Sequence, residues 1–547
     1  MSLLDLLAFI LAAVAAIVAL QFLADRTRLP AAALFTVAGL VYAVLPGPNL
    51  QLDPHVILTF VIPPLIYSAA LNSSLLAIRA NLRTVISLSI GLVLATAIIT
   101  GAGTALFVPG VGLAAGVALG AAISPTDPVA ALAVGGRAGL PAKLITIIEG
   151  EGLLNDATAL TTLTVAVTAA ASGGFSLGDA IGRFLLAAAG GLLAGVVVAV
   201  AVRLLLTVVR DPLLVNGISL ATPFAAYLLG EELHVSGVLA VAVAGLMVGH
   251  NTPRFTSGAS RLQAAAVWHL ADFLLQGFVF LLIGQQIMPV VRGLKAYPAA
   301  TIWAAAAVSL GVVLLLRPLW LAATQSLPRA VHQRRGQQAA DGTGHLSGRE
   351  IAVLSWAGTR GVISLAAIFT LPLTTAGGRP FPGRDLLLFC AFLVVLVTLI
   401  GQGLTFGPVA RVLRVRADPA DAVLLRTQAR AASVQAGLSR LDQLAADDDV
   451  LGAAVPAPAL DALRTSLEQK ARRYRQLLGR LEDSEDAAPA AAPEYQAAVQ
   501  ARRSVIDAQR EELLRWRDAG HLPDASLRLL ERELDHEERT LPPHEGH

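Results

Sequence analysis

The stretch SPTDPVA, residues 124–130, interrupts an apolar run that is otherwise long enough to cross a lipid bilayer. Pro125 and Pro128 remove backbone donors and clash with the preceding turn, so we expect the chain to unwind around Thr126 and Asp127. Unwound backbone inside a membrane is tolerated only where protein or a water-filled cavity satisfies its polar groups. An aspartate at that depth also needs a partner, a proton or water. The stretch therefore predicts a polar site within a helical membrane protein.

The composition extends this interpretation to most of the chain. Of the 547 residues, 55% are hydrophobic, and the mean hydropathy is +0.66. The chain is largely apolar up to residue 411 and then becomes rich in Arg, Asp and Glu, which predicts a membrane domain over 1–411 and a cytoplasmic helical tail over 412–547. The net charge of +2 is spread over short loops and this tail, so we expect no nucleic-acid partner. No nucleotide or metal motif is visible in the tail, and we expect no cofactor.

The apolar segments predict an all-α protein that crosses the membrane many times. A bilayer core of about 30 Å needs roughly 20 apolar residues per helix, and on this scale we expect about 13 spans. The expected spans are 3–24, 32–47, 55–77, 82–107, 112–134, 143–172, 180–209, 212–230, 234–251, 266–291, 299–325, 349–374 and 385–411.

The positive charges indicate how these spans are oriented. If alternate loops face the cytoplasm, most basic loop residues fall on one side, which places the N-terminus outside and the tail inside. The residues on the cytoplasmic side are Arg26, Arg28, Arg79, Arg83, Arg137, Lys143, Arg203, Arg210, Arg254, Arg261, Arg329, Arg334, Arg335 and Arg349.

A second interruption, WAGTRGVIS at 356–364, lies in the twelfth expected span. If spans one to six and eight to thirteen are repeats joined by the seventh, the two interrupted spans are equivalent and the repeats insert with opposite topology. Paired broken helices predict a transporter with a binding site near the membrane midplane. Asp127 could neutralise the N-terminal ends of the half-helices there, and Arg360 their C-terminal ends. A plain proline kink capped by Asp127 is the alternative.

Acidic residues gather in the sixth expected span, which begins IIEGEGLLNDATAL. Glu149 and Asp156 are seven residues apart and share one helical face, whereas Glu151 and Asn155 are four apart and share another. One face can therefore stabilise structure while the other meets solvent. Asn155 can support the broken helix without titrating.

Asp156 is the candidate for carrying the transported ion. The charged form of a carboxylate is disfavoured in a narrow, partly dehydrated cavity, so it can hold either a proton or a hard cation. Oxygen atoms from Asp156, Thr126, backbone carbonyls at the break and water suit a small monovalent cation, without selecting Na⁺ over K⁺ or Li⁺. Asp156 could instead be only the partner of Arg360, although Glu151 is the better candidate for that pairing.

Two further features lie outside this centre. His269 and Asp272, three residues apart, could form a proton relay, but we favour a cap at the start of the tenth span. The tail has apolar residues at helical spacing and Pro/Ala-rich breaks at 455–459 and 488–493, which predicts about four helices. A regulatory or dimer-stabilising tail and a solvated helix set without a ligand both fit this pattern.

Four motifs together resemble the sodium/proton antiporters of the NhaP/NHE branch of the monovalent cation:proton antiporters. They are SPTDPVA (124–130), EGLLNDATAL (151–160), FVFLLIGQ (278–285) and GTRGVISLA (358–366). Each is weak alone, but four in this order on the expected spans are specific. The resemblance covers about residues 1–411.

The resemblance implies a role for each matching residue. Asp156 is the exchanged-ion carboxylate and Asn155 its neutral neighbour. Thr126 and Asp127 occupy the Thr-Asp positions of the broken helix, and with Asp156 and Asn155 they form the ion-binding set. Glu151 matches a glutamate that pairs with the arginine matched here by Arg360.

Other positions differ from the family pattern or are only candidates. Gly152 stands where relatives often have Ser, so this chain has one side-chain oxygen fewer near the ion. Gln276, Glu149 and Thr359 are candidates for lining the cavity.

The resemblance also implies an activity and an assembly. The expected activity is one-for-one, electroneutral exchange of a monovalent cation, Na⁺ first, for H⁺ in an NhaA-like fold with elevator-type motion. Core helices over 82–172 and 299–411 would move against dimerisation helices over 1–77 and 212–291 in a homodimer. The compact loops and Ala/Arg-rich usage favour a bacterial inner membrane.

Three rival functions fit parts of the same pattern. They are K⁺/H⁺ antiport, a cation channel, and an intramembrane aspartyl protease with Asp127 and Asp156 as its dyad. Channels usually build their charged rings by oligomeric symmetry, whereas here two unlike interruptions carry opposite charges in one chain. A protease dyad should sit on comparable motifs, and these two aspartates do not. We therefore expect a transporter rather than an enzyme.

Overall fold

The computed structural model describes residues 3–27, 29–45, 54–172, 177–334, 346–375, 377–417, 419–446, 457–483, 493–519, 521–522 and 524–539. The chain divides into two compact units, Met1–Ala417 and Asp418–His547. The division falls shortly after the change in composition at residue 411. Within the described ranges both units are helical, and the only β feature is an isolated bridge between Thr374 and Pro380.

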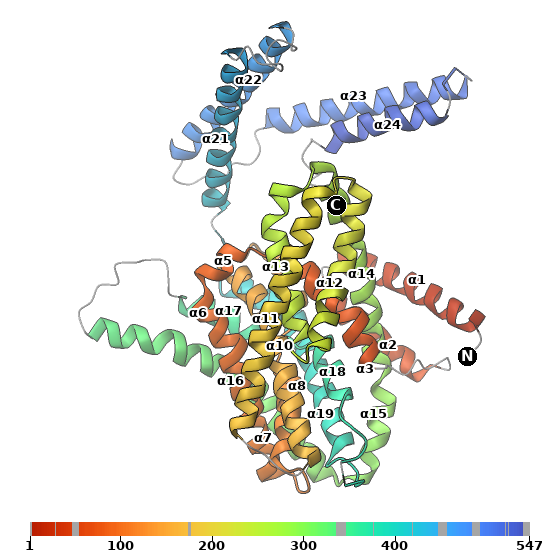
Figure 1. The fold of residues 1–547 in the computed structure, drawn as a ribbon, viewed down its shortest axis with the longest axis vertical. Coiled ribbons are helices and arrows are strands. Elements are labelled where there is room, and N and C mark those ends of the chain that lie inside the picture. Colours follow the sequence, from red (N-terminus) through yellow and green to blue (C-terminus); the bar gives the residue numbers. More distant parts are fainter. Residues whose placement is uncertain are drawn as a thin grey trace. The chain divides into compact units, whose positions relative to one another are not determined.

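The first unit is built from apolar helices, several of them interrupted (Figure 1). They are α1 (Leu3–Thr27), α2 (Ala31–Val44), α3 (Pro54–Val56), η1 (Ile57–Val61), α4 (Ile62–Asn72), α5 (Leu75–Ala80), α6 (Leu82–Ile86), η2 (Ser87–Leu92), α7 (Val93–Phe107), α8 (Leu113–Ile123), α9 (Val129–Ala138), α10 (Ala142–Ser172), α11 (Leu177–Val208), α12 (Pro212–Glu232), α13 (Gly237–Phe255), α14 (Gly258–Gln285), α15 (Ile287–Gly293), η3 (Leu294–Ala296), α16 (Ala299–Arg334), α17 (Gly348–Trp356), α18 (Val362–Phe369), α19 (Arg384–Leu396), η4 (Val397–Gln402) and α20 (Gly403–Val412).

Eight helical segments in the described part of the chain are long and apolar enough to cross a membrane. They are Leu7–Thr27, Leu82–Phe107, Ala142–Ala171, Ala180–Val208, Pro212–Glu232, Gly258–Ala296, Ala299–Gln325 and Arg384–Val412. Shorter apolar helices cover Ala31–Val44, Ile57–Asn72 and Leu113–Ile123. Large apolar side chains such as Leu106 and Leu213, each 78% exposed, lie on the outer surface, as suits a lipid-facing protein. The chain is a multi-pass membrane protein.

The ends of several helices are set by local capping rather than by hydropathy. The expected tenth span began at 266, but α14 begins at Gly258, because the Ser257 hydroxyl accepts a hydrogen bond from Ser260 N. The expected third span ran to 77, but α4 ends at Asn72, where Ser73 adopts an extended conformation. Hydropathy therefore misses a polar first turn, as in α14, and runs past a break between apolar helices, as after α4.

The expected fifth and twelfth spans are both split, into α8 and α9 and into α17 and α18. Helices α7, α10, α18 and α19 contact α8, and α16, α10 and α20 contact α17. Helix α7 approaches α8 closely, because a Cβ on Gly120 would lie 2.7 Å from the Cα of Ala97. The broken helices are therefore enclosed by protein, as unwound backbone in a membrane requires.

The second unit contains α21 (Pro419–Ala446), α22 (Ala457–Asp483), α23 (Pro493–Asp518) and α24 (Asp524–Arg539). Helix α21 packs on α22, and α23 packs on α24. Ion pairs join the members of each pair, Arg464 with Asp442 in the first and Arg510 with Asp535 and Glu538 in the second. The composition predicted about four helices here, and the described residues form these four.

Candidate functional site

The two interrupted helices meet at their breaks. Helix α8 ends at Ile123 and α9 starts at Val129, while α17 ends at Trp356 and α18 starts at Val362. The backbone N–H of Asp127 donates to the carbonyl oxygen of Thr359 at 2.7 Å, and Thr359 Oγ1 donates to the carbonyl oxygen of Asp127 at 2.7 Å. Each break thus supplies hydrogen bonds that the other lost when its helix unwound.

Asp127 lies against the N-terminal ends of two half-helices. Its Oδ1 accepts a hydrogen bond from the backbone N–H of Val129 at 2.9 Å, at the start of α9. Its Oδ2 lies so close to Gly361, the residue before α18, that a Cβ at that position would overlap it. A negative charge is favourable at helix N-termini, so this carboxylate stabilises the crossing, as the sequence indicated.

Arg360 lies at the C-terminal end of α8. Its Nε donates to the carbonyl oxygen of Ile123 at 3.0 Å, and its Nη1 donates to the carbonyl oxygen of Gly358. Its backbone N–H donates to Thr398 Oγ1 at 3.0 Å, from the π-helical turn η4. The predicted role of Arg360 at a half-helix C-terminus agrees with these bonds.

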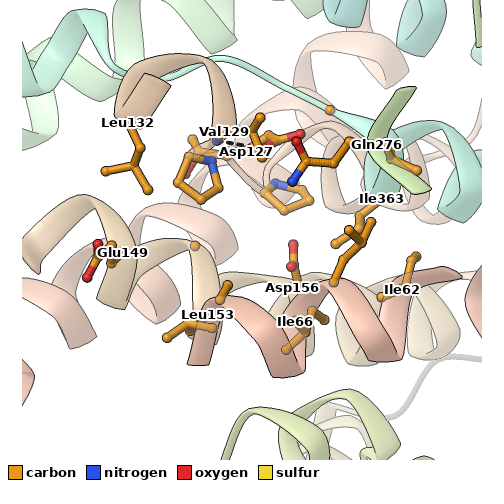
Figure 2. Close-up of a pocket in the computed structure, with 18 of the residues that line it drawn as sticks. Ile62, Ile66, Asp127, Val129, Leu132, Glu149, Leu153, Asp156, Gln276 and Ile363 are labelled. Carbon is orange, nitrogen blue, oxygen red and sulfur yellow. Dashed lines mark hydrogen bonds between the residues drawn. The ribbon is translucent and has the colours of Figure 1, made fainter. Parts of the chain in front are cut away.

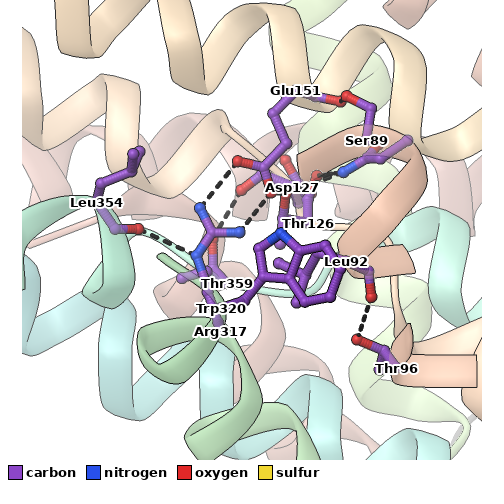
Figure 3. Close-up of polar contacts among 12 residues, drawn as sticks. Ser89, Leu92, Thr96, Thr126, Asp127, Glu151, Arg317, Trp320, Leu354 and Thr359 are labelled. Carbon is purple, nitrogen blue, oxygen red and sulfur yellow. Dashed lines mark hydrogen bonds and ion pairs between the residues drawn. The ribbon is translucent and has the colours of Figure 1, made fainter. Parts of the chain in front are cut away.

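The buried partner of Glu151 is Arg317, not Arg360, so the predicted Glu151–Arg360 ion pair is wrong (Figure 3). Arg317 Nη2 donates to Glu151 Oε2 at 2.9 Å, Nη1 bonds Oε1, and both side chains are only 2% exposed. Arg317 Nε also donates to the carbonyl oxygen of Leu354 at 3.0 Å, in the last turn of α17. Arg317 therefore binds the C-terminal turn of α17 and Arg360 that of α8, and among the described residues Arg317 is the one that forms an ion pair with Glu151.

Sequence reasoning missed Arg317, although the sequence carries a signal for it. The residue is a lone arginine in LLLRPLWL, in the middle of the expected span 299–325. A buried arginine in a membrane needs a carboxylate or carbonyl partner, so its position requires a neighbour such as Glu151.

Glu151 also holds the first break through two neutral side chains. Thr126 Oγ1 donates to Glu151 Oε1 at 2.8 Å, and Asn155 Nδ2 donates to Thr126 Oγ1 at 2.9 Å and to its carbonyl oxygen at 3.2 Å. Asn155 is 1% exposed and does not line the cavity described next. On this face of α10, Glu151 and Asn155 both bond Thr126 at the first break, and Asn155, expected in the ion-binding set, does not border the cavity.

The other face of α10 borders a cavity of about 390 Å³ (Figure 2). The cavity lies between α4, α9, α10, α14, α18 and the first break. Its polar lining residues are Asn72, Ser73, Thr126, Asp127, Glu149, Asp156, Asp272, Gln276 and Ser364. Glu149 and Gln276 line it, as proposed from the sequence, whereas Thr359 does not.

Asp156 is directed into this cavity, with its carboxylate toward the break that carries Asp127. The side chain is 5% exposed, and no hydrogen bond or ion pair involving it is found among the described residues. The described lining includes acidic side chains and no basic one. A cavity of this charge is suited to a cation or a proton.

Gly152 lets α10 approach the break. A Cβ at residue 152 would lie 2.9 Å from the Cδ and Cγ atoms of Pro128. A serine there would collide with the proline ring, so the missing side-chain oxygen is explained by close packing.

His269 and Asp272 lie inside α14 rather than at its start, so the prediction that they cap this helix is wrong. Asp272 Oδ2 instead accepts a hydrogen bond from Ser68 Oγ at 2.5 Å.

Two broken helices that cross beside a buried carboxylate define the class of ion-coupled membrane transporters with discontinuous helices. A family model described as "Sodium/hydrogen exchanger, transmembrane" matches residues 10–412. The chain belongs to the sodium/hydrogen exchanger family.

Relatives agree with this assignment. An uncharacterised Na⁺/H⁺ exchanger of Mycobacterium tuberculosis is 35% identical over 98% of this chain and 96% of its own length. The "Sodium, potassium, lithium and rubidium/H(+) antiporter" of Bacillus subtilis is 33% identical over 66% of this chain and 55% of its own. The sodium proton antiporter MjNhaP1 from Methanocaldococcus jannaschii has the same fold, with a TM-score of 0.60 and 18% identity over 75% of this chain and 99% of that one.

Proposed function

We propose that this protein exchanges a monovalent cation for H⁺ across the membrane, with Asp156 carrying either ion. The observation that carries the proposal is the contrast between Asp156 and the groups around it. Glu151, Arg317 and Arg360 are engaged in bonds that hold the broken helices, whereas the Asp156 carboxylate faces an acidic cavity. A carboxylate in that setting can bind a proton or a cation, but not both at once.

Competition for Asp156 gives exchange without further machinery. A core with neutralised Asp156 can cross the low-dielectric barrier, because it carries no uncompensated charge. Thr126, Asp127, backbone carbonyls at the break and water would complete the cation's oxygen shell. Asn155 is neutral, so Asp156 alone would titrate in this pair, which supports one cation per proton and electroneutral exchange.

We propose Na⁺ as the first cation, with K⁺ and Li⁺ as the other candidates. The carboxylate and carbonyl oxygens around Asp156 are suited to each of them. The printed name of the Bacillus subtilis relative, which includes sodium, potassium and lithium, supports testing all three.

We further propose the assembly and orientation in which exchange takes place. Core helices over 82–172 and 299–411 would move as a unit against dimerisation helices over 1–77 and 212–291, with two inverted six-helix repeats and about 13 membrane crossings. The protein would be a homodimer in a bacterial inner membrane, with the N-terminus outside and the tail in the cytoplasm. The basic residues of alternate loops support the orientation.

Proton movement in everted vesicles tests the exchange. Vesicles with an imposed pH gradient receive Na⁺, Li⁺ or K⁺ separately, with wild type, Asp156→Asn and Glu232→Gln as the three proteins. Glu232→Gln is the matched control, since it neutralises an exposed acid at the end of α12. We expect a cation to collapse the gradient with wild type and the control, but not with Asp156→Asn.

Two results would count against this function. If no cation collapses the gradient with folded wild type between about pH 6 and 9, antiport is wrong. If cations pass down their own gradient without moving protons, the cation channel is the better assignment.

A further inference from the structure

Asp272 is a carboxylate of the cavity that the proposed exchange leaves without a role. It lines the same cavity as Asp156 and comes from α14. Ser68 of α4 donates a hydrogen bond to its Oδ2 at 2.5 Å, which fixes the carboxylate in place. Its Oδ1 is buried and has no hydrogen-bond partner in the described part of the chain.

The basic side chains near Asp272 line a second cavity and not the cavity of Asp156. A second cavity of about 480 Å³ shares Asn72 and Asp272 with the first, and its basic lining residues are Arg261 and His269. His269 precedes Asp272 by three residues on α14 and interacts with it electrostatically. Neither Arg261 nor His269 lines the cavity of Asp156. In the cavity of Asp156, no basic side chain among the described lining residues therefore neutralises the Asp272 carboxylate.

We propose that Asp272 binds the monovalent cation in the first cavity before it reaches Asp156, and so sets the cation concentration that exchange needs. This inference rests on the proposed function. Bringing a cation into a partly dehydrated cavity is unfavourable unless a fixed negative charge offsets the loss of water. An oxygen without a hydrogen-bond donor provides that charge and a ligand of the right chemistry.

Asp272 and Asp156 stand on helices that belong to different proposed domains. Ser68 and Asp272 stand on α4 and α14, within the proposed dimerisation helices, whereas Asp156 stands on α10 of the proposed core. If the core moves, Asp156 leaves the cavity that Asp272 lines. Asp272 therefore assists cation binding from one face of the membrane only.

The test is the KM for NaCl, LiCl or KCl, whichever wild type exchanges, measured from each membrane face in proteoliposomes of known orientation. The proteins are wild type, Asp272→Asn, Asp272→Glu, Ser68→Ala and the control Glu231→Gln, which removes a carboxylate of α12 outside the cavity. We expect Asp272→Asn to raise KM by about tenfold on one face, with Vmax within about twofold of wild type. Ser68→Ala should raise KM less on that same face, and Asp272→Glu should recover most of the affinity.

The outcomes separate this inference from the proposed function. If Asp272→Asn exchanges cations with an unchanged KM on both faces, the inference about Asp272 is wrong but the proposed function stands. The same holds if the KM of Asp272→Asn rises equally on both faces, or if the KM of Glu231→Gln rises as much as that of Asp272→Asn. If Asp272→Asn does not fold, an unchanged KM of Ser68→Ala on both faces overturns it instead. Wild type that exchanges no cation would overturn the proposed function and the role of Asp272 with it.

Discussion

Asp127 and Thr359 hold each other through two reciprocal hydrogen bonds, one from the Asp127 N–H to the Thr359 carbonyl and one from Thr359 Oγ1 to the Asp127 carbonyl, each 2.7 Å long. The residues are far apart in sequence, and each lies at the centre of a broken helix. The two breaks therefore form one structural unit, and a change in one should disturb the other.

Replacing Thr359 by Val tests this coupling. The change keeps the shape of the side chain but leaves the Asp127 carbonyl without its donor, which we expect to destabilise the protein by about 1–3 kcal/mol. The measurement is thermal unfolding of the detergent-purified protein. Thr96→Val is the control, since among the described residues this buried hydroxyl donates to the carbonyl oxygen of Leu92, one turn earlier in the chain (2.7 Å). Equal stability losses in both variants would show that the crossing bond has no special role.

Gly361 should tolerate no side chain. A Cβ there would overlap the Asp127 carboxylate, so Gly361→Ala must displace either α18 or the cap of α9. We expect exchange to be lost and the melting temperature to fall. Gly217→Ala, in α12, meets no atom within 4 Å of its new Cβ. Because alanine is the better helix former by about 0.5–1 kcal/mol, that control should melt at the same or a higher temperature. A Gly361→Ala protein with normal exchange would contradict the close contact.

Much of this arrangement could be predicted from the sequence, because prolines and glycines in apolar spans act locally. SPTDPVA and WAGTRGVIS located both breaks, and the i,i+7 and i,i+4 spacings separated the cavity-facing and structural sides of α10. The pairing of Glu151 could not be obtained in this way, since the choice between Arg317 and Arg360 depends on how helices remote in sequence pack. The sequence singled out Asp272 only as a relay or cap with His269, and its place in the cavity could not be predicted, because its partner Ser68 comes from α4.

The choice of Arg317 over Arg360 leads to a double-mutant cycle. Arg317→Met leaves Glu151 buried without its partner, so we expect a loss of about 3–5 kcal/mol of stability. Glu151→Gln in the same chain should restore a large part of that loss, since no buried charge is then unpaired. The cycle of Glu151→Gln with Arg360→Met should show a smaller coupling energy, because the Arg360 guanidinium bonds backbone carbonyls. A larger coupling to Arg360 than to Arg317 would contradict the pairing.

The second unit offers a test of the α23–α24 pair. Arg510 Nη2 bonds Asp535 at 2.5 Å and Glu538 at 2.7 Å, which joins the two helices. Exposed ion pairs contribute about 0.2–1 kcal/mol each, so Arg510→Ala should speed hydrogen exchange of α24 amides in the full chain severalfold. Arg515→Ala is the control, because this side chain pairs only with acids of its own helix among the described residues. Similar exchange in both variants would show that the cross-helix pair adds nothing measurable.

The pairing of neutral Asn155 with Asp156 predicts exchange that does not respond to membrane voltage. If one proton replaces one cation on a single carboxylate, no net charge crosses, whereas each uncompensated charge would couple to the potential by about 2.3 kcal/mol per 100 mV. The measurement is the current on a solid-supported membrane after a Na⁺ concentration jump, with proton flux followed by a pH-sensitive dye in the same proteoliposomes. We expect proton flux without net current, and gramicidin-containing liposomes provide the positive control for current. A current that grows in proportion to proton flux would show that the numbers of protons and cations exchanged per cycle differ. A second titratable group besides Asp156 would then take part.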